Sequence, residues 1–218
     1  MNLIIEKLLE YADTYGSLIP LSIILLLFSK RKMPLGVKLL AAYFILSFLL
    51  FGLSNYLADR SINNLFIYHI FAILEFVFIG QFFRTIISSK KFKSSSLYII
   101  IIFCLLALIN SILFEKFTTL NSNVIAIEFL LLIIFSFIYY FELSYSEEVL
   151  VFYRQPNFWI ITGFFVYFAS CILIFALYKY TAVTNRQFVL KFWLIQVVMY
   201  IVKNIILAKG ILCYRYNK

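Results

Sequence analysis

Seven apolar stretches of about twenty residues, separated by short polar segments, constrain this chain more than any other feature. A helix of about twenty apolar residues crosses the roughly 30 Å hydrocarbon core of a bilayer, because each residue adds about 1.5 Å. We therefore predict an all-α polytopic membrane protein, a bundle of seven transmembrane helices. Their expected ranges are 12–29, 36–57, 64–86, 96–114, 122–142, 157–178 and 187–209.

A transmembrane β-barrel would also satisfy the backbone in lipid, but its strands alternate apolar and polar residues over segments of about ten residues. The run from Leu97 to Leu108 does not alternate, so helices are favoured. With 64% hydrophobic and only 13% charged residues, the composition excludes an ordinary water-soluble fold. The connections leave no room for a soluble domain, and we expect residues 1–218 to form a single seven-helix transmembrane domain.

Basic residues gather in alternate connections. The first connection contains Lys30, Arg31 and Lys32, the third contains Lys90 and Lys91, and the second and fourth contain few. The positive-inside rule then puts the N-terminus outside and the C-terminus in the cytoplasm. The net charge of +9 is explained by this pattern, so the lipid bilayer and not nucleic acid is the expected partner.

Two of the expected cytoplasmic connections have a distinctive composition. Residues 88–95 are basic and rich in serine, which predicts a solvated loop near anionic lipid headgroups, with a docking site as the alternative. Residues 143–156 combine Glu147 and Glu148 with apolar and aromatic side chains. This composition fits packing along the membrane interface, or contact with a cytoplasmic partner.

Several polar side chains fall inside the apolar stretches, where inserting a charge costs about 2.5–3.5 kcal/mol and requires a partner, a cavity or neutralisation. We expect a polar pocket open to the extracellular or periplasmic side, with Lys203 further inside. The alternative is that these groups only bond neighbouring helices or reach to the surface. The candidate ligand-binding or proton-binding residues are Glu75, Glu128, His69, Gln196, Lys191, Asn110 and Tyr68.

Helical register refines this set. Tyr68 and Glu75 are seven residues apart and share a helix face, whereas His69 points about 120° away from Glu75. We therefore do not expect His69 and Glu75 to touch.

Several activities find little support in the sequence. Lys203 in the last helix is typical of retinal proteins, but Met199 stands one turn earlier where microbial rhodopsins usually have an acidic or small polar residue, and no aromatic pocket pattern is evident. One histidine with scattered glutamates does not supply the ligands of a metalloprotease, and Asp13 and Asp59 lie at or outside helix ends. The cysteines, without paired spacing, are expected to be apolar fillers. We expect no catalytic residue, metal or cofactor, with a lipid-modifying enzyme as an alternative.

Two functions remain open. The first is a receptor-like sensor or binding subunit that recognises a small or lipid-like ligand in an outward-facing pocket and acts through a cytoplasmic or membrane partner. The second is a channel or carrier for a proton, an ion or a small solute, with Glu75 and Glu128 along the path. No internal repeat is evident, which weakens the carrier hypothesis.

Short strings spread along the chain carry a resemblance. They are Tyr68-His69-Ile70 followed by Glu75-Phe76, Asn123 with Glu128-Phe129, and Pro156-Asn157-Phe158-Trp159-Ile160 followed by Gly163 and Tyr167. In these strings the chain resembles an uncharacterised group of small standalone bacterial seven-helix membrane proteins. The resemblance implies a partner such as a sensor histidine kinase, which favours the sensor. Frequent Phe, Ile, Lys, Asn and Tyr are typical of an AT-rich bacterial genome, so we expect the cytoplasmic membrane of a bacterium.

Overall fold

The computed structural model of this protein describes residues 11–12, 14–29, 32–180 and 186–215, and its regular structure over these ranges is entirely helical. Six helices are long and apolar enough to cross a membrane, so the chain is an all-α multi-pass membrane protein. The elements are α2 (Leu18–Phe28), α3 (Leu35–Asp59), α4 (Phe66–Ile86), α5 (Lys90–Leu113), α6 (Ser122–Ser144), the 3₁₀ helix η1 (Glu147–Arg154), α7 (Pro156–Ala176) and α9 (Arg186–Cys213).

The first predicted span, 12–29, is realised as the short helix α2. A turn at Gly16 and Ser17 precedes it, and its 11 residues measure about 17 Å, roughly half of the hydrocarbon thickness. Pro20 lies in the first turn of α2, where a missing backbone N–H is tolerated. The prediction of seven spanning helices therefore holds for six helices, with a short apolar helix before them.

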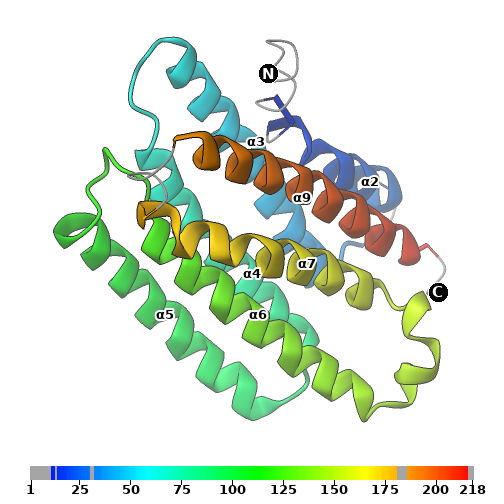
Figure 1. The fold of residues 1–218 in the computed structure, drawn as a ribbon. Coiled ribbons are helices and arrows are strands. Elements are labelled where there is room, and N and C mark those ends of the chain that lie inside the picture. The colour runs from blue at the N-terminus through cyan, green and yellow to red at the C-terminus, as the bar shows by residue number, and fades with distance from the viewer. Residues whose placement is uncertain (1–10, 13, 30–31, 181–185, 216–218) are drawn as a thin grey trace.

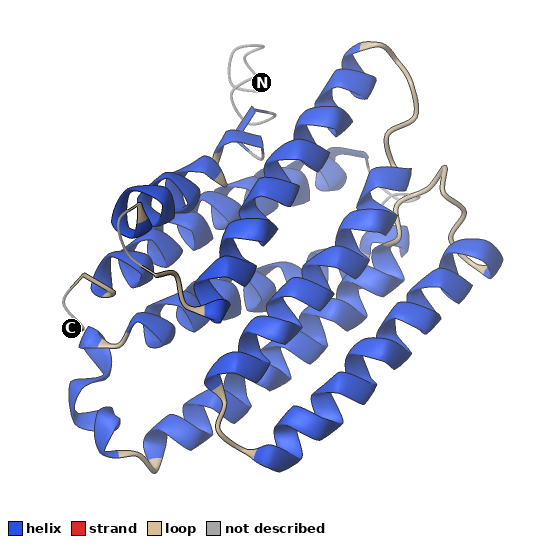
Figure 2. Cartoon of the chain, turned by 180° about the vertical axis from the view of Figure 1, so that it is seen from behind, coloured by secondary structure: helices blue, strands red, loops and turns tan. Residues whose placement is uncertain are grey.

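Six helices form a closed ring in which each packs on two neighbours, in the order α2, α3, α4, α6, α7, α9. α5 lies outside this ring against α4 and packs only lightly on α6 (Figure 1). Successive helices run in opposite directions, so their connections alternate between two ends of the bundle (Figure 2). The first and last helices of this order, α2 and α9, close the ring.

We call one end of the bundle the basic end. It carries the connections 29–34, 87–89 and 145–155, with Lys32 and Arg154 among their residues. The opposite end carries the connections 60–65 and 114–121. Each of the six long helices therefore has one terminus at each end, and a residue's place along such a helix gives its depth in the bundle.

The basic segment 88–95, predicted as a solvated loop, is mostly helical. The Ser89 side chain caps α5 by accepting a hydrogen bond from the Phe92 N–H at 3.3 Å, and α5 begins at Lys90. Arg84 of α4 secures this turn by donating from Nε to the Lys93 carbonyl at 3.1 Å. The loop prediction is wrong because a serine cap satisfies backbone groups that water would otherwise bond.

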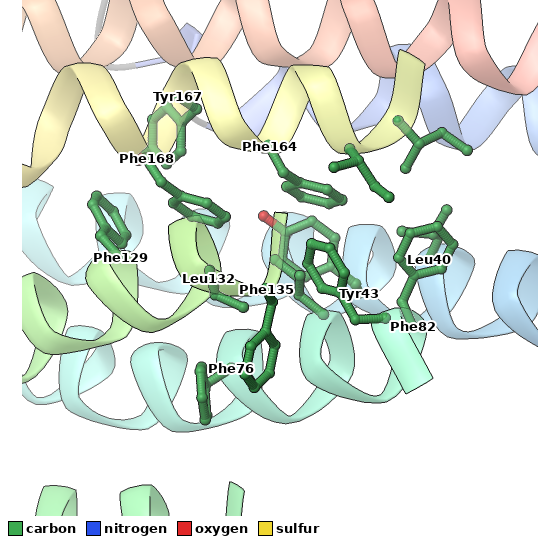
Figure 3. Packing of buried hydrophobic residues seen from close by; sticks show 14 of the residues in the cluster. Leu40, Tyr43, Phe76, Phe82, Phe129, Leu132, Phe135, Phe164, Tyr167 and Phe168 are labelled. Atoms are coloured by element: carbon green, nitrogen blue, oxygen red, sulfur yellow. The ribbon is translucent and has the colours of Figure 1, made fainter. Parts of the chain in front are cut away.

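The outer surface of the bundle is apolar, unlike that of a soluble protein. On α5 the large apolar side chains Leu105, Ile112 and Leu113 are 56%, 71% and 69% exposed, as suits a helix facing lipid. Inside the ring, tightly packed aromatic rings make up much of the core (Figure 3). Glu75, Glu128 and other charged or polar groups are buried among them, away from the lipid-facing surface.

α7 and α9 approach most closely at two glycines. A Cβ on Gly163 would lie 2.6 Å from Leu207 Cδ1, and a Cβ on Gly210 would lie 2.9 Å from the Pro156 backbone oxygen and 2.7 Å from Ile160 Cγ1. Small residues at such contacts allow membrane helices to pack backbone against backbone. These contacts fix the part of α9 that carries Lys203.

Gly210→Ala is expected to destabilise the protein by about 1–3 kcal/mol, because backbone atoms of α7 must move to make room. The control is Gly52→Ala, where the nearest atom to a new Cβ is Thr14 Cγ2 at 3.7 Å, so this change should be neutral or slightly stabilising. Thermal unfolding in detergent measures both. Equal melting temperatures for the two variants would contradict the close approach of α7 and α9.

Candidate functional site

A chain of hydrogen bonds joins three buried side chains at the centre of the ring. Lys203 Nζ of α9 donates to the Tyr43 hydroxyl of α3 at 2.9 Å, and that hydroxyl donates to Glu75 Oε1 of α4 at 2.7 Å. Lys203 is 0% exposed and Glu75 is 4% exposed. The Lys203 ammonium and the Tyr43 hydroxyl both donate in the direction of the Glu75 carboxyl group, so Tyr43 can bridge an ion pair between Lys203 and Glu75. We call Lys203, Tyr43 and Glu75 the central triad.

Aromatic rings surround the ammonium group of Lys203. Its Nζ lies 4.1 Å from the ring centre of Tyr200, 4.6 Å from that of Tyr167 and 5.9 Å from that of Phe164. Cation–π attraction of this kind partly replaces the hydration that burial removes. These rings come from different helices, so they form no pattern that the sequence alone could show.

Glu128 of α6 is the most unusual of the buried acids. It is 0% exposed, and among the described residues neither of its carboxyl oxygens has a hydrogen-bond partner. An ionised carboxylate in such surroundings costs several kcal/mol unless a charge or a donor meets it. Glu128 therefore requires a proton, a cation or a water molecule.

Both carboxyl groups face one small cavity. Its volume is about 30 Å³, and Glu75, Glu128, Gln196 and Tyr68 line it together with apolar side chains. This space suffices for a water molecule or a small cation, since a water needs roughly 10–15 Å³ by this measure. Drug-sized ligands occupy cavities of about 300–1,000 Å³ and would not fit.

The cavity extends from the middle of the bundle toward the opposite end. Glu128 lies in the first two turns of α6 at that end, and Glu75 lies near the middle of α4. The lining also includes Leu120 of the connection 114–121 and Trp193, which is 40% exposed. We call the cavity and the central triad, which lie next to one another between the opposite end and the middle of the bundle, the buried path.

An apolar barrier separates this path from the basic end. Leu40, Phe82, Ile160 and Leu207 are each at most 1% exposed and lie closer to the basic end than the central triad does. Figure 3 shows Leu40 and Phe82 on the side of Tyr43 away from Phe129. Charged groups would have to cross several layers of apolar side chains to reach the basic end.

The structure brings together four of the seven candidate residues. Glu75, Glu128, Gln196 and Tyr68 line the cavity. Lys191 lies exposed near the start of α9, outside that lining.

His69 and Asn110 belong to a second polar cluster at the opposite end. His69 Nδ1 lies 2.7 Å from Ser111 Oγ, and His69 Nε2 lies 2.9 Å from the Thr119 carbonyl oxygen. Because a carbonyl only accepts, Nε2 is the protonated donor of this second bond. His69 thereby ties the connection 114–121 to α4 and, as its helical register predicts, its ring nitrogens engage these groups and not Glu75.

Glu115 organises the rest of this second cluster. Its carboxylate accepts hydrogen bonds from Asn110 Nδ2 at 2.7 Å, Ser122 Oγ at 2.9 Å and the Asn123 N–H at 3.2 Å. It also forms a salt bridge of 3.0 Å with Lys179, which follows α7. Burial alone would raise the pKa of Glu115, but these bonds outweigh it and lower the pKa below its ordinary value of 4.5.

Glu115→Gln is expected to cost about 1–3 kcal/mol of stability at neutral pH, because an amide cannot accept all four bonds. A carboxyl whose pKa is lower in the folded protein stabilises it above the unfolded-state pKa, and this contribution disappears as the pH falls through the folded-state pKa. The difference in melting temperature between wild type and variant, measured from pH 7 downward, should therefore begin to shrink below about pH 4.5, the ordinary pKa of a glutamate. A constant difference across this range would contradict the role of the ionised carboxylate.

Sequence reasoning passed over Tyr43 and Glu115 and left Lys203 outside the site. Tyr43 is one of 16 tyrosines, and nothing in its neighbours marks it. Glu115 lies beyond the apolar stretch, where acidic residues are ordinary. For Lys203 the signal was present, since a lysine within a spanning helix needs a partner.

No family model, curated protein or solved structure matches the chain. The resemblance to small bacterial seven-helix proteins therefore stays a prediction, and the function of this chain must be inferred from its site.

Proposed function

We propose that this protein is a carrier for protons, or for a small monovalent cation, that loads from the opposite end of the bundle. One observation carries the proposal: Glu128 is fully buried, has no hydrogen-bond partner among the described residues, and faces a water-sized cavity that it shares with Glu75. Ionisable residues inside a membrane bundle commonly mark such pathways.

Charge balance supports a site for one positive charge. The buried centre holds one lysine and two glutamates, and Tyr43 bridges Lys203 to Glu75. With these two groups ionised and paired, Glu128 is the group that a proton or cation must neutralise. Loading of one positive charge makes the centre neutral, which suits its passage through an apolar interior.

The depths of the groups support transport over simple binding. Glu128, Glu75 and the Tyr43–Lys203 pair occupy successive depths, and a binding site alone would not need this spacing. A proton on Glu128 can reach Glu75 through a water in the cavity, and the Tyr43 hydroxyl connects Glu75 to Lys203. Release at the basic end then requires the apolar barrier to open in a second conformation.

The test is proton flux into liposomes that hold the purified protein and a pH-sensitive dye, with the membrane potential clamped. Wild type should acidify the interior faster than empty liposomes, and Glu128→Gln and Glu75→Gln should reduce the rate to that of empty liposomes. Tyr43→Phe should slow it while keeping the packing. The matched control is Glu142→Gln on the same helix, since Glu142 lies near the basic end and accepts from the Ser88 N–H at 2.7 Å.

Flux that is the same in wild type, Glu75→Gln and Glu128→Gln would overturn the proposal. Replacing the proton gradient by a sodium or potassium gradient, with an ion-sensitive dye, distinguishes the cation from the proton.

A second candidate, a receptor-like sensor that acts through a partner, is supported by the apolar barrier, which leaves entry from one side only. Its ligand would be a proton or small cation, because the cavity is too small for a larger molecule. Uptake of one proton per molecule in detergent, dependent on Glu128 and without flux in liposomes, would favour the sensor. Absence of uptake and of flux, for protons and for sodium or potassium ions alike, would exclude both functions.

We also propose seven crossings in a bacterial cytoplasmic membrane, with the N-terminus outside, the basic end in the cytoplasm, and α2 lying in the first crossing. The basic residues around α4 and α5 support this orientation. Labelling with an impermeant thiol reagent in intact cells should mark Lys116→Cys and spare Lys91→Cys. The reverse pattern would invert the topology.

A further inference from the structure

A long groove runs along the outer surface between α5 and α6. Its two sections have volumes of about 480 and 440 Å³, and they share Ile99 of α5 and Leu131 of α6 as lining residues, so they are continuous. The groove exists because α5 packs on α4 and only lightly on α6. Its walls are almost entirely apolar.

The section near the basic end has a polar rim. The capping residue Ser89 lines it there together with Lys91 and Ser95 of α5. Ile99, Ile134 and Ile138 line it toward the middle of the membrane. Lys91 is exposed and forms no salt bridge among the described residues. The section therefore offers a cation and hydroxyl groups at headgroup level above an apolar slot.

We propose that this section binds an anionic phospholipid of the leaflet at the basic end, with its phosphate at Lys91 and the α5 serines and one acyl chain in the slot between α5 and α6. Charge decides for an anionic headgroup, because Lys90, Lys91 and Lys93 give this end of α5 three positive charges against the single nearby carboxylate of Glu142. From Lys91 to Ile99 the helix rises about 12 Å, close to the depth of one leaflet of the hydrocarbon core. This site is separate from the buried centre and stands whether or not the chain carries protons.

The experiment is native mass spectrometry of the detergent-solubilised full chain titrated with phosphatidylglycerol or with phosphatidylcholine. Wild type should bind the anionic lipid more tightly. Lys91→Gln should weaken phosphatidylglycerol binding about fivefold, as expected for one lysine at a lipid surface, and leave phosphatidylcholine binding unchanged. The matched control is Lys38→Gln, which removes the same charge from an exposed position near the start of α3 that does not line the groove.

A second variant, Ile134→Trp, tests the slot itself. Ile134 is 43% exposed, so a larger side chain can fill the groove without entering the core, and binding of both lipids should fall. Equal binding of the two lipids by wild type, or full binding by Ile134→Trp, would overturn the proposal. Competition by inorganic phosphate would also overturn it, because the site would then bind phosphate alone. A dimer that Ile134→Trp dissociates would overturn it as well, because a second copy of the chain would then occupy the groove.

Discussion

Lys203→Met should destabilise the protein by about 3–5 kcal/mol, the largest effect expected of any single change in the bundle. The substitution leaves the Glu75 carboxylate and the Tyr43 hydroxyl buried without the cation that Tyr43 bridges to Glu75. Loss of one partner of a buried ion pair costs this much because the remaining charge is neither hydrated nor compensated. Unfolding in detergent, followed by circular dichroism, measures the change.

The double variant Lys203→Met/Glu75→Gln is the control for this prediction. With no charge left in the central triad, it should recover much of the lost stability, so the two substitutions are strongly non-additive. Additive losses would mean that Lys203 acts through its aromatic neighbours and not through Glu75. Lys209→Met provides a comparison, since Lys209 is exposed and lies over the Trp159 ring at 3.3 Å, where its charge stays hydrated.

Glu128→Leu should have the opposite sign and stabilise the protein by about 1–3 kcal/mol. A leucine of similar size removes two buried oxygens that have no hydrogen-bond partner among the described residues. Glu128→Gln should bring little gain, because its amide still lacks partners. Thermal unfolding of wild type, Glu128→Gln and Glu128→Leu at one constant pH measures these differences, and Glu128→Leu should have the highest melting temperature.

The same Glu128→Leu variant should lose proton uptake and flux altogether. A stabilising change that abolishes activity is the behaviour expected of a functional group kept at a cost in stability. Glu142→Leu on the same helix should leave flux intact. If Glu128→Leu were destabilised, Glu128 would instead be a structural group with partners that form in the membrane.

The apolar pattern predicted the spanning helices well because lipid enforces their length. The predicted range 64–86 and helix α4, Phe66–Ile86, differ by two residues at one end. The prediction of helix boundaries failed at positions that the thickness of the lipid bilayer does not determine. Ser89 begins a helix in the basic segment, and Gly16 and Ser17 interrupt the first span, and both depend on local backbone bonding.

The site was predictable in part. Depth along each span indicated that Glu75, Glu128 and Gln196 could meet, and all three line one cavity. The depth of a residue does not show which helices are neighbours. The sequence therefore places His69 and Asn110 in the same pocket, whereas in the structure they bond to the connection 114–121 at the opposite end. The pairing of Tyr43 with Lys203, 160 residues apart, depends on the contact of helices that the sequence does not specify.

Closure of the ring by α2 and α9 has a consequence for biogenesis. Tyr43, Glu75 and Glu128 leave the ribosome and enter the membrane well before Lys203, because α9 is made after all their helices. Until then the two acids lack the cation that their final surroundings provide, and the nascent bundle must hold them near water or in the neutral form. Insertion of α9 is thus the step that supplies a positive charge to the buried acids, and a chain without α9 would leave them uncompensated in the hydrocarbon.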